Sequence, residues 1–393
     1  MRRRHEMRER LDVLIAGAGP AGAATALRLA RAGFRVAAVD RAEFPREKIC
    51  SEYMSPEGVR HLAALGVLEA VERSGGHPVR GTTVHAPRGA RLTGLFARAG
   101  HAPFRDTGLS VARRLLDQAL VDAARAAGAL VHERTAVVGV LREDDAVAGL
   151  AVRNGDGAVR ELRARLTVGA DGLRSLVARA LGGRKTGPLH RYALVAHVAE
   201  DVGLNPLGGG VTNVAVVVPE ARIGAAKGAA ERFFQAELDR IPGVRGRVRS
   251  GAIVREVLVT GPFAVRARRV AAPGALLVGD AADFFDPFTG EGICAALRGA
   301  ELVEAAATGV LARPGPVTGA ALRPYVSARR RAFFGKWAVE RAIGYAMLAP
   351  ALFDRAVERL ERRGLAHTLI GVTGDFVPPR AVLNPVFLSQ VVF

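Results

Sequence analysis

A glycine-rich turn near the start of the chain constrains the fold more than any other feature. It consists of Gly17, Ala18, Gly19, Pro20, Ala21 and Gly22. An apolar run at 11–16, typical of a buried strand, precedes it, and a helix pattern that continues to residue 31 follows it. A second buried strand is predicted at 34–40. A strand, tight turn, helix and strand within about 30 residues form the unit of a parallel sheet with right-handed crossovers.

The spacing of the three glycines predicts a nucleotide site at this turn. Gly17 permits the tight turn, Gly19 lets a pyrophosphate approach the backbone, and Gly22 allows the helix to pack closely on the strand. The pyrophosphate would then meet the positive end of the helix dipole. Asp40 ends the second strand, close to the offset of ~20 residues at which a carboxylate accepts hydrogen bonds from ribose hydroxyls. We therefore predict a dinucleotide site rather than a turn that serves packing alone.

The rest of the chain carries both helix and strand patterns. Helices are predicted at 56–65, 67–73, 110–128 and 292–308, and through the tail at 317–365. Strands are predicted at 130–140, 146–152, 158–162, 166–170, 192–199, 211–218, 251–260 and 275–278. Short alternating runs and glycine-rich loops fill 79–104 and 185–265. We interpret these two segments as a second, mainly antiparallel layer inserted into the first domain.

Three further segments resemble flavoprotein motifs. Residues 168–175, Val-Gly-Ala-Asp-Gly-Leu-Arg-Ser, resemble the ADG motif of flavoprotein hydroxylases. Residues 277–293 contain Gly-Asp-Ala-Ala and then Pro-Phe-Thr-Gly-Glu-Gly-Ile, similar to the GDAA and P…G-G motif of the same enzymes. Arg113 begins a third match, Arg-x-x-Leu-Asp-x-x-Leu. The motifs fall in the right order over most of 11–310, so the chain resembles the FAD-dependent monooxygenase superfamily, and within it the geranylgeranyl-reductase-like branch.

The resemblance implies an α/β fold with three regions. A discontinuous Rossmann-type FAD-binding domain is expected at 1–78, 105–184 and 266–311. The inserted, mainly antiparallel β-sheet at 79–104 and 185–265 would bind the substrate. A helical C-terminal region is expected at 312–393. We expect the substrate cavity to lie between the FAD-binding domain and the inserted sheet.

Two aspartates are candidate FAD ligands. Asp280, just after a predicted buried strand, is placed to accept a hydrogen bond from a ribityl hydroxyl, although a helix N-cap or turn aspartate would give the same pattern. The resemblance places Asp171 near the FAD diphosphate and the path of a nicotinamide donor, although Asp-Gly is also a common turn pair. The helix start after Pro287 offers free N–H groups, which suit the negative charge of reduced flavin.

Three basic residues complete the predicted cofactor site. By resemblance Arg113 contacts a flavin phosphate, and Arg41 and Lys48 contact the adenosine; each could instead be a solvated charge. The predicted FAD-binding residues are Gly17, Ala18, Gly19, Pro20, Ala21, Gly22, Asp40, Arg41, Lys48, Arg113, Asp171, Gly279, Asp280, Pro287, Gly290, Glu291, Gly292 and Ile293. No catalytic acid or base is predicted.

The segment 46–56 resembles a stretch of the reductase-like branch. It reads Arg-Glu-Lys-Ile-Cys-Ser-Glu-Tyr-Met-Ser-Pro, against Lys-x-Cys-Gly-Glu…Ser-Pro in that branch, so Ser51 stands where glycine is usual. Cys50 could lie near the flavin and take part in redox chemistry, but a lone cysteine is more often a small buried hydrophobe. Four histidines fall in the expected substrate layer and could line a pocket: His85, His101, His190 and His197.

The composition limits which binding partners and which cellular compartment are expected. The net charge of +18 is nearly all arginine, spread along the chain without interleaved stacking aromatics, so no nucleic-acid partner is predicted. Only Cys50 and Cys294 are present, which suits a reducing cytoplasm. No stretch reaches the ~18 uninterrupted apolar residues of a membrane span. The histidines show no metal-ligand spacing, so no metal is predicted.

Two enzymatic functions fit this reading. The leading hypothesis is an FAD-dependent oxidoreductase that takes electrons transiently from NAD(P)H and hydroxylates or epoxidises an apolar or aromatic small molecule. The second is a flavin-dependent reductase that saturates carbon–carbon double bonds of an isoprenoid or lipid substrate. The Gly290–Ile293 segment favours the reductase, whereas the absence of the Tyr-x-Trp-x-Phe-Pro motif of that family weighs against it.

Other functions fit less well. Trp337 is the only tryptophan, which argues against a flavin halogenase, because that family carries a two-tryptophan motif. A non-catalytic flavin-binding protein is a third hypothesis, and it predicts no NAD(P)H-dependent bleaching of the flavin. The helical tail is expected either to cover the substrate cavity or to touch a membrane surface.

Overall fold

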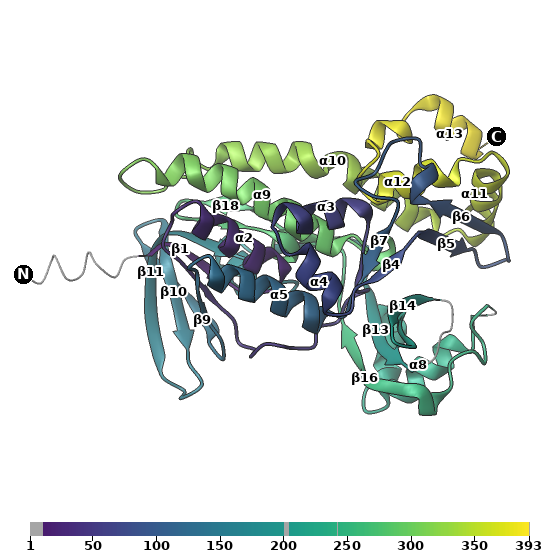
Figure 1. Ribbon diagram of the computed structural model, residues 1–393, viewed down its shortest axis with the longest axis horizontal. Helices are drawn as coiled ribbons and strands as arrows, with labels where there is room; N and C mark the ends of the chain where they lie inside the picture. Colours follow the sequence, from purple (N-terminus) through teal and green to yellow (C-terminus); the bar gives the residue numbers. More distant parts are fainter. Residues whose placement is uncertain (1–10, 200–203, 242, 393) are drawn as a thin grey trace, which may run out of the picture.

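A parallel sheet forms the centre of the protein (Figure 1). The computed structural model describes residues 11–199, 204–241 and 243–392. The main path of the eight-stranded sheet runs in the order β18 (Ala271–Ala272), β19 (Ala275–Leu277), β11 (Val159–Gly169), β1 (Leu11–Ala16), β2 (Val36–Val39) and β8 (Leu130–His132). The pairs β19–β11, β11–β1, β1–β2 and β2–β8 are parallel, as predicted for a Rossmann-type domain.

Each face of strand β1 faces a separate apolar core, because successive side chains of a strand point to opposite faces. Val13 and Ile15 belong to the larger core, which also holds buried residues of the helices on that face. Leu14 and Ala16 belong to the smaller core on the other face, with residues of the hairpin strand β10 (Ala146–Arg153) and of α6 (Leu176–Ala180). All four side chains are fully buried. This two-sided burial explains the uninterrupted apolar run.

The helices of the larger core carry the turns that matter for function. Helix α2 (Pro20–Arg31) packs on α5 (Arg113–Ala126) and α9 (Gly292–Leu311), and α10 (Arg323–Ala346) runs beside α9 (Figure 1). Two short helices, α3 (Pro56–Ala64) and α4 (Leu68–Arg73), complete this layer. Helix α3 begins where predicted because Ser55 accepts a hydrogen bond from the Gly58 N–H and proline occupies the first turn.

An antiparallel sheet of four strands lies beside the parallel sheet. Its order is β14 (Asn205–Gly208), β15 (Val211–Pro219), β13 (Arg191–Val198) and β16 (Ile253–Thr260). Leu194, Ala196 and Val198 of β13 share an apolar cluster with Phe234 of α8 (Ala230–Leu238). The alternate β13 residues Ala193 and Val195 pack instead with Ile49, Leu173 and Phe284 of the FAD-binding segments.

The two segments predicted to form one inserted layer lie in different sheets. Residues 79–104 contain the hairpin β5 (Gly81–His85) and β6 (Arg91–Leu95), which is a separate two-stranded sheet. This hairpin packs on the C-terminal helices, drawn in yellow in Figure 1: α11 (Pro350–Arg362), α12 (Ala366–Thr373) and α13 (Pro385–Val392). Side chains of Glu361 and His367 accept hydrogen bonds from backbone N–H groups of β6. The alternation of apolar and polar residues in a strand does not show what packs on its apolar face. The sequence pattern therefore could not distinguish packing on the other sheet from packing on the C-terminal helices.

Several predicted boundaries need correction. The strand predicted at 130–140 is two strands, β8 and β9 (Ala136–Glu143), because the chain turns at Arg134 with φ of 50°. The strands predicted at 158–162 and 166–170 are one strand, β11, whose first half pairs antiparallel with β10 (Ala146–Arg153) and whose second half pairs parallel with β1. The helix predicted from residue 110 begins at Arg113, after the short strand β7 (Gly108–Ser110).

The remaining elements are short. They are β3 (Tyr53–Met54), β4 (His77–Val79), β12 (Arg184–Thr186), β17 (Val265–Ala267), β20 (Asp283–Phe284), α7 (Glu220–Ile223) and the 3₁₀ turns at 96–98, 224–226, 250–252, 279–281, 287–289 and 379–381. The helical tail continues past the predicted end at 365, through α12 and α13. Within the described residues, no helix combines the length and apolarity needed to cross a bilayer.

Candidate functional site

The glycine-rich turn packs closely against the end of β11. Gly17 has φ of 92°, and a Cβ there would lie 2.6 Å from the Ala170 carbonyl oxygen. A Cβ on Gly22 would lie 1.8 Å from the Gly17 carbonyl oxygen, so helix α2 can begin here only with glycine. Ala21 packs on Gly279 of the second motif, where an added Cβ would come within 2.9 Å. Three predicted motifs, at 17–22, 170–171 and 279–280, therefore meet in one place.

Asp40 fixes the turn through its side chain. Its Oδ2 accepts a hydrogen bond from the Ala18 N–H at 2.8 Å, and its Oδ1 accepts one from the Ala42 N–H at 2.9 Å. The carboxylate thus ties the end of β2 to the first turn of the nucleotide motif. Its predicted contact with a ribose stays a prediction.

Two arginines face the open side of the turn. A Cβ on Gly19 would lie 3.3 Å from a guanidinium nitrogen of Arg46 and 3.8 Å from one of Arg113. Both arginines pair with the fully buried Asp117, at 3.1 Å and 2.8 Å. Burial alone would lower the pKa of Arg113, but Asp117 raises it above the ordinary value, so Arg113 stays charged.

Lys48 and Asp280 extend this cluster. Lys48 is exposed by its accessible surface, and partial desolvation, followed by the nearby Arg46 and Arg113, lowers its pKa. Burial raises the pKa of Asp280, whereas Lys48 and Arg113 oppose that shift. Arg184 also donates to the Asp280 carbonyl oxygen at 3.0 Å. Arg46, Lys48 and Arg113 therefore gather three positive charges near the start of α2, an arrangement suited to a diphosphate.

The predicted residues Arg41 and Asp171 lie at the edge of this cluster. Arg41 is exposed and still contributes to lowering the Lys48 pKa. The Asp171 carboxylate accepts hydrogen bonds from the Ser175 hydroxyl at 2.5 Å and from the Leu176 N–H at 2.6 Å, so it serves the start of α6. The Asp171 Cα would lie 3.1 Å from a Cβ on Gly17. Asp171 is therefore beside the nucleotide turn, and a cofactor contact stays a prediction.

The loop before α9 and the first turn of α9 contain the predicted residues from Pro287 to Ile293. Pro287 begins a 3₁₀ turn, and Gly290 follows with φ of 72° against the Tyr53 ring, which lies 2.7 Å from where a Cβ would be. Glu291 is buried, Gly292 begins α9, and Ile293 is buried in the larger core. The N–H groups at the start of α9 thus follow a loop that packs against the Tyr53 ring.

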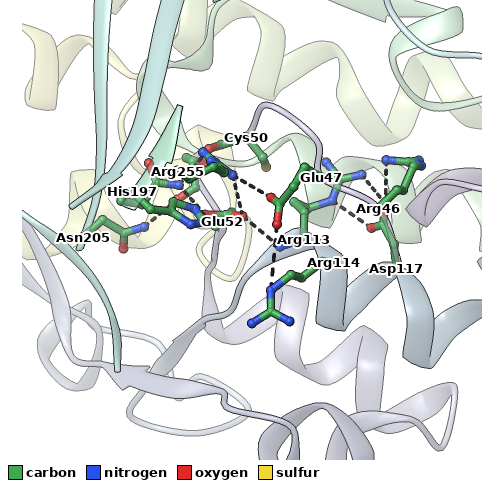
Figure 2. A network of polar contacts seen from close by, with 12 residues as sticks. Arg46, Glu47, Cys50, Glu52, Arg113, Arg114, Asp117, His197, Asn205 and Arg255 are labelled. Atoms are coloured by element: carbon green, nitrogen blue, oxygen red, sulfur yellow. Dashed lines mark hydrogen bonds and ion pairs between the residues drawn. The ribbon is translucent and has the colours of Figure 1, made fainter. Parts of the chain in front are cut away.

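Sequence reasoning missed the residue that organises the neighbouring network, Glu52 (Figure 2). Its side chain is fully buried and its φ is 59°. Its Oε2 accepts from His197 Nε2 at 2.5 Å and from the Asn213 amide at 2.6 Å, and its Oε1 accepts from the Arg113 N–H at 2.8 Å. Arg255 lies 3.6 Å from the same Oε1. One carboxylate therefore joins β13, β15, β16 and the start of α5.

The charge state of Glu52 follows from these contacts. Burial tends to raise the pKa of Glu52, but the hydrogen bond and charge of His197 and the Arg113 N–H bring it below the ordinary value. The resemblance of residues 46–56 to the reductase-like segment was the available signal, since that segment contains this glutamate. Arg46 belongs to the same segment and was also left out of the predicted set.

Cys50 lies beside Arg113, and the Asn213 amide donates to the Cys50 carbonyl oxygen at 2.9 Å. Of the four histidines proposed for the substrate layer, His197 enters the network, while His190 contacts Glu220 at 2.9 Å on the surface. His85 and His101 are exposed. In the described parts of the chain, no group of three or more His, Cys, Asp or Glu side chains could hold a metal ion.

Comparisons with known proteins agree with this geometry. Residues 10–247 match the FAD binding domain family. A digeranylgeranylglycerophospholipid reductase of Methanosarcina mazei is 27% identical, over 77% of this chain and 76% of the relative. A 6-methylpretetramide 4-monooxygenase of Streptomyces rimosus is 29% identical, over 81% of this chain and 84% of the relative. The crystal structure of a flavoprotein/dehydrogenase from Cytophaga hutchinsonii shares the fold, with a TM-score of 0.81, 20% identity and coverage of 98% and 97% of the two chains.

The residues of the site fit FAD. Gly17 has no room for a Cβ beside the Ala170 backbone, and the cluster of Arg46, Lys48 and Arg113 supplies the charge that a diphosphate needs. The matched family model spans more than half of the chain. The chain therefore belongs to the FAD binding domain family and is an FAD-dependent oxidoreductase.

Proposed function

We propose that this protein uses NAD(P)H to reduce its FAD and then saturates carbon–carbon double bonds of an apolar, isoprenoid-type substrate. The observation that carries the proposal is the position of residues 46–56, the segment that resembles the reductase-like branch. Lys48 of this segment belongs to the cation cluster, and Glu52 joins the four-stranded sheet to α5. The segment thus forms part of the wall between the cofactor site and the inserted sheet.

Bound FAD would supply the hydride chemistry, and the chain's own residues would hold and shield it. The start of α2 with Arg46 and Lys48 would bind the diphosphate. Ala193 and Val195 of β13 present an apolar face toward the FAD-binding segments, where they pack with Phe284. The cleft beside this cluster is lined by the aromatic residues Phe284, Phe285, Phe333 and Trp337. An apolar chain lying in that cleft would be kept away from water, which suits transfer of hydride to a double bond.

The second candidate function is oxygenation of an apolar or aromatic small molecule. It is favoured by the similarity to the Streptomyces rimosus monooxygenase, which extends over 81% of this chain. The missing Tyr-x-Trp-x-Phe-Pro motif also favours it. The same cofactor site and the same electron donor would serve both reactions, so the substrate and the fate of O₂ decide between them.

Exposed apolar side chains of the C-terminal helices offer a surface that an apolar substrate could reach from a membrane. Leu348 and Leu352 near the start of α11 and Val386 and Leu388 of α13 are all at least half exposed. We propose a peripheral membrane contact here that delivers an apolar substrate. Both cysteines are free thiols, which fits a reducing compartment, and we place the reaction in the cytoplasm.

The test is an incubation of the FAD-loaded protein with NADH or NADPH and a prenylated lipid, first without and then with O₂. Double-bond reduction predicts bleaching of the flavin and a product heavier by two hydrogens per saturated bond under anaerobic conditions. A product heavier by one oxygen atom, formed only with O₂, would establish the second candidate. A flavin that neither donor bleaches would contradict both and favour a non-catalytic flavin-binding protein.

A further inference from the structure

Glu291 and Lys336 form a buried charge pair at the start of α9. Glu291 is 3% exposed and Lys336, on α10, is 4% exposed. The Lys336 Nζ lies 3.9 Å from the Glu291 Oε2, too far for a hydrogen bond, and the Ser55 hydroxyl donates to the same Oε2 at 3.1 Å. Neither the Lys336 Nζ nor the Glu291 Oε1 has a hydrogen-bond partner in the structure. A buried ammonium without a hydrogen bond, as at Lys336, is costly and calls for a functional explanation.

The pair sits on the loop expected to face the flavin. Glu291 occupies the N-cap position of α9, but its side chain makes no capping hydrogen bond. One cleft between this loop and α10 is lined by Asp280, Glu291, Gly292, Lys336 and Trp337, among others. The charged pair therefore shares a cleft with the predicted ribityl ligand Asp280 and with the first residue of α9.

Burial and mutual attraction act in opposite directions on the pKa values of Glu291 and Lys336. Burial raises the pKa of Glu291 to about 7, although Lys336 opposes the shift. Burial would lower the pKa of Lys336, but Glu291 raises it, so the ammonium persists. The titratable and charged groups around the pair come from several elements: Tyr53 of β3, Cys294 and Arg298 of α9, Glu340 of α10, and Asp375, which pairs with Arg298.

We propose that Glu291 and Lys336 are positioning residues that set the local charge at the start of α9 and thereby the reduction potential of the bound FAD. Reduced flavin carries negative charge, which the α9 N-terminus and the Lys336 ammonium stabilise. The negative charge of the Glu291 carboxylate opposes this stabilisation of reduced flavin. When Glu291 is protonated, no negative charge of this pair offsets the positive charge of Lys336. This inference goes beyond the proposed function, because it holds whether the reduced flavin acts on a double bond or on O₂.

The experiment is an equilibrium redox titration of the FAD-loaded protein and of E291Q, K336M and the double variant. E291Q should favour the reduced flavin by about tenfold, a shift of about 30 mV to a more positive potential for a two-electron couple. K336M should shift the potential by a similar amount in the negative direction. The double variant should return close to the wild type, because both charges are gone. K227M, at an exposed lysine, is the matched control.

The pH dependence and two conservative variants separate charge from structure. Lowering the pH from 8 to 6 should add a positive shift in the wild type that E291Q lacks. K336R and E291D keep the charges and should keep the potential near that of the wild type, even if the neutral variants lose FAD. Shifts of the same sign in E291Q and K336M, or none beyond K227M, would overturn the inference. Failure of the wild type to take up FAD would contradict the family assignment instead.

Discussion

The Nε2 atom of His197 and the Oε2 atom of Glu52 lie 2.5 Å apart, across the boundary between the four-stranded sheet and the FAD-binding segments. Both side chains are buried, and His197 is 7% exposed. Glu52 holds this position with φ of 59°, a conformation that costs a non-glycine residue free energy. The strained backbone is retained because the side chain must reach three other partners from this point.

We predict that E52Q destabilises the protein by about 3 kcal/mol, because breaking a buried ionic network leaves its partners unsatisfied. Urea denaturation measures the change. The matched control is E43Q, which removes an exposed ion pair with Arg134 and should cost less than about 1 kcal/mol. Equal effects of the two substitutions would show that Glu52 does not join the sheet to the FAD-binding segments.

The stability contributed by Glu291 should depend on pH in a defined direction. Its folded-state pKa of about 7 lies above the ordinary value of 4.5, so the native state holds the proton more tightly than the unfolded chain does. The contribution is fully present below pH 4.5 and is lost as the pH rises through about 7. The stability of the wild type minus that of E291Q should therefore fall from pH 4.5 to pH 8, by at most about 3 kcal/mol. Denaturation curves across this range would contradict the prediction if the difference stayed constant or rose.

Gly17→Ala should abolish FAD binding and destabilise the protein by about 1–3 kcal/mol. The new Cβ would meet the backbone of Ala170 at 2.6 Å, where no flexible side chain can yield. Gly33→Ala is the matched control: it has a similar φ of 87° with open space around it, so it should cost about 1–2 kcal/mol and leave FAD binding intact. Flavin fluorescence and thermal denaturation of the two variants separate the roles, and retained FAD binding in the Gly17 variant would refute the assignment of this turn.

Lys48→Met should weaken FAD binding about tenfold and reduce its dependence on salt, because one cation leaves the diphosphate cluster. K227M, which removes an exposed lysine, should leave the affinity unchanged. Titration of the apoprotein with FAD at low and high ionic strength measures both effects. An unchanged affinity in the Lys48 variant would place this residue outside the cofactor site.

The local patterns of the sequence were enough to predict the parallel sheet and the cofactor turn. A run of apolar residues at 11–16 buried on both faces, three spaced glycines and Asp40 all act within one stretch of about 30 residues. The motif around Asp280 lies against the same turn, because Ala21 packs on Gly279, and the contacts of both segments with FAD stay predictions.

The contacts between residues that are far apart in the sequence could not be predicted in the same way. A strand pattern states which side chains share a face, but it does not say what covers that face. The pattern therefore predicts one layer for 79–104 and 185–265, whereas the hairpin at 79–104 packs on the C-terminal helices. Glu52 and His197 are 145 residues apart, and neither spacing nor composition brings them together. Lys336 likewise reaches Glu291 from a different helix.

The sequence by itself was enough to predict a dinucleotide site at a glycine turn, because that chemistry depends on backbone freedom and on residues close together in the chain. Only the tertiary structure decided which buried charged side chains lie next to one another. Their pKa values and their free energies depend on burial and on distances between segments, and these quantities exist only once the chain has folded.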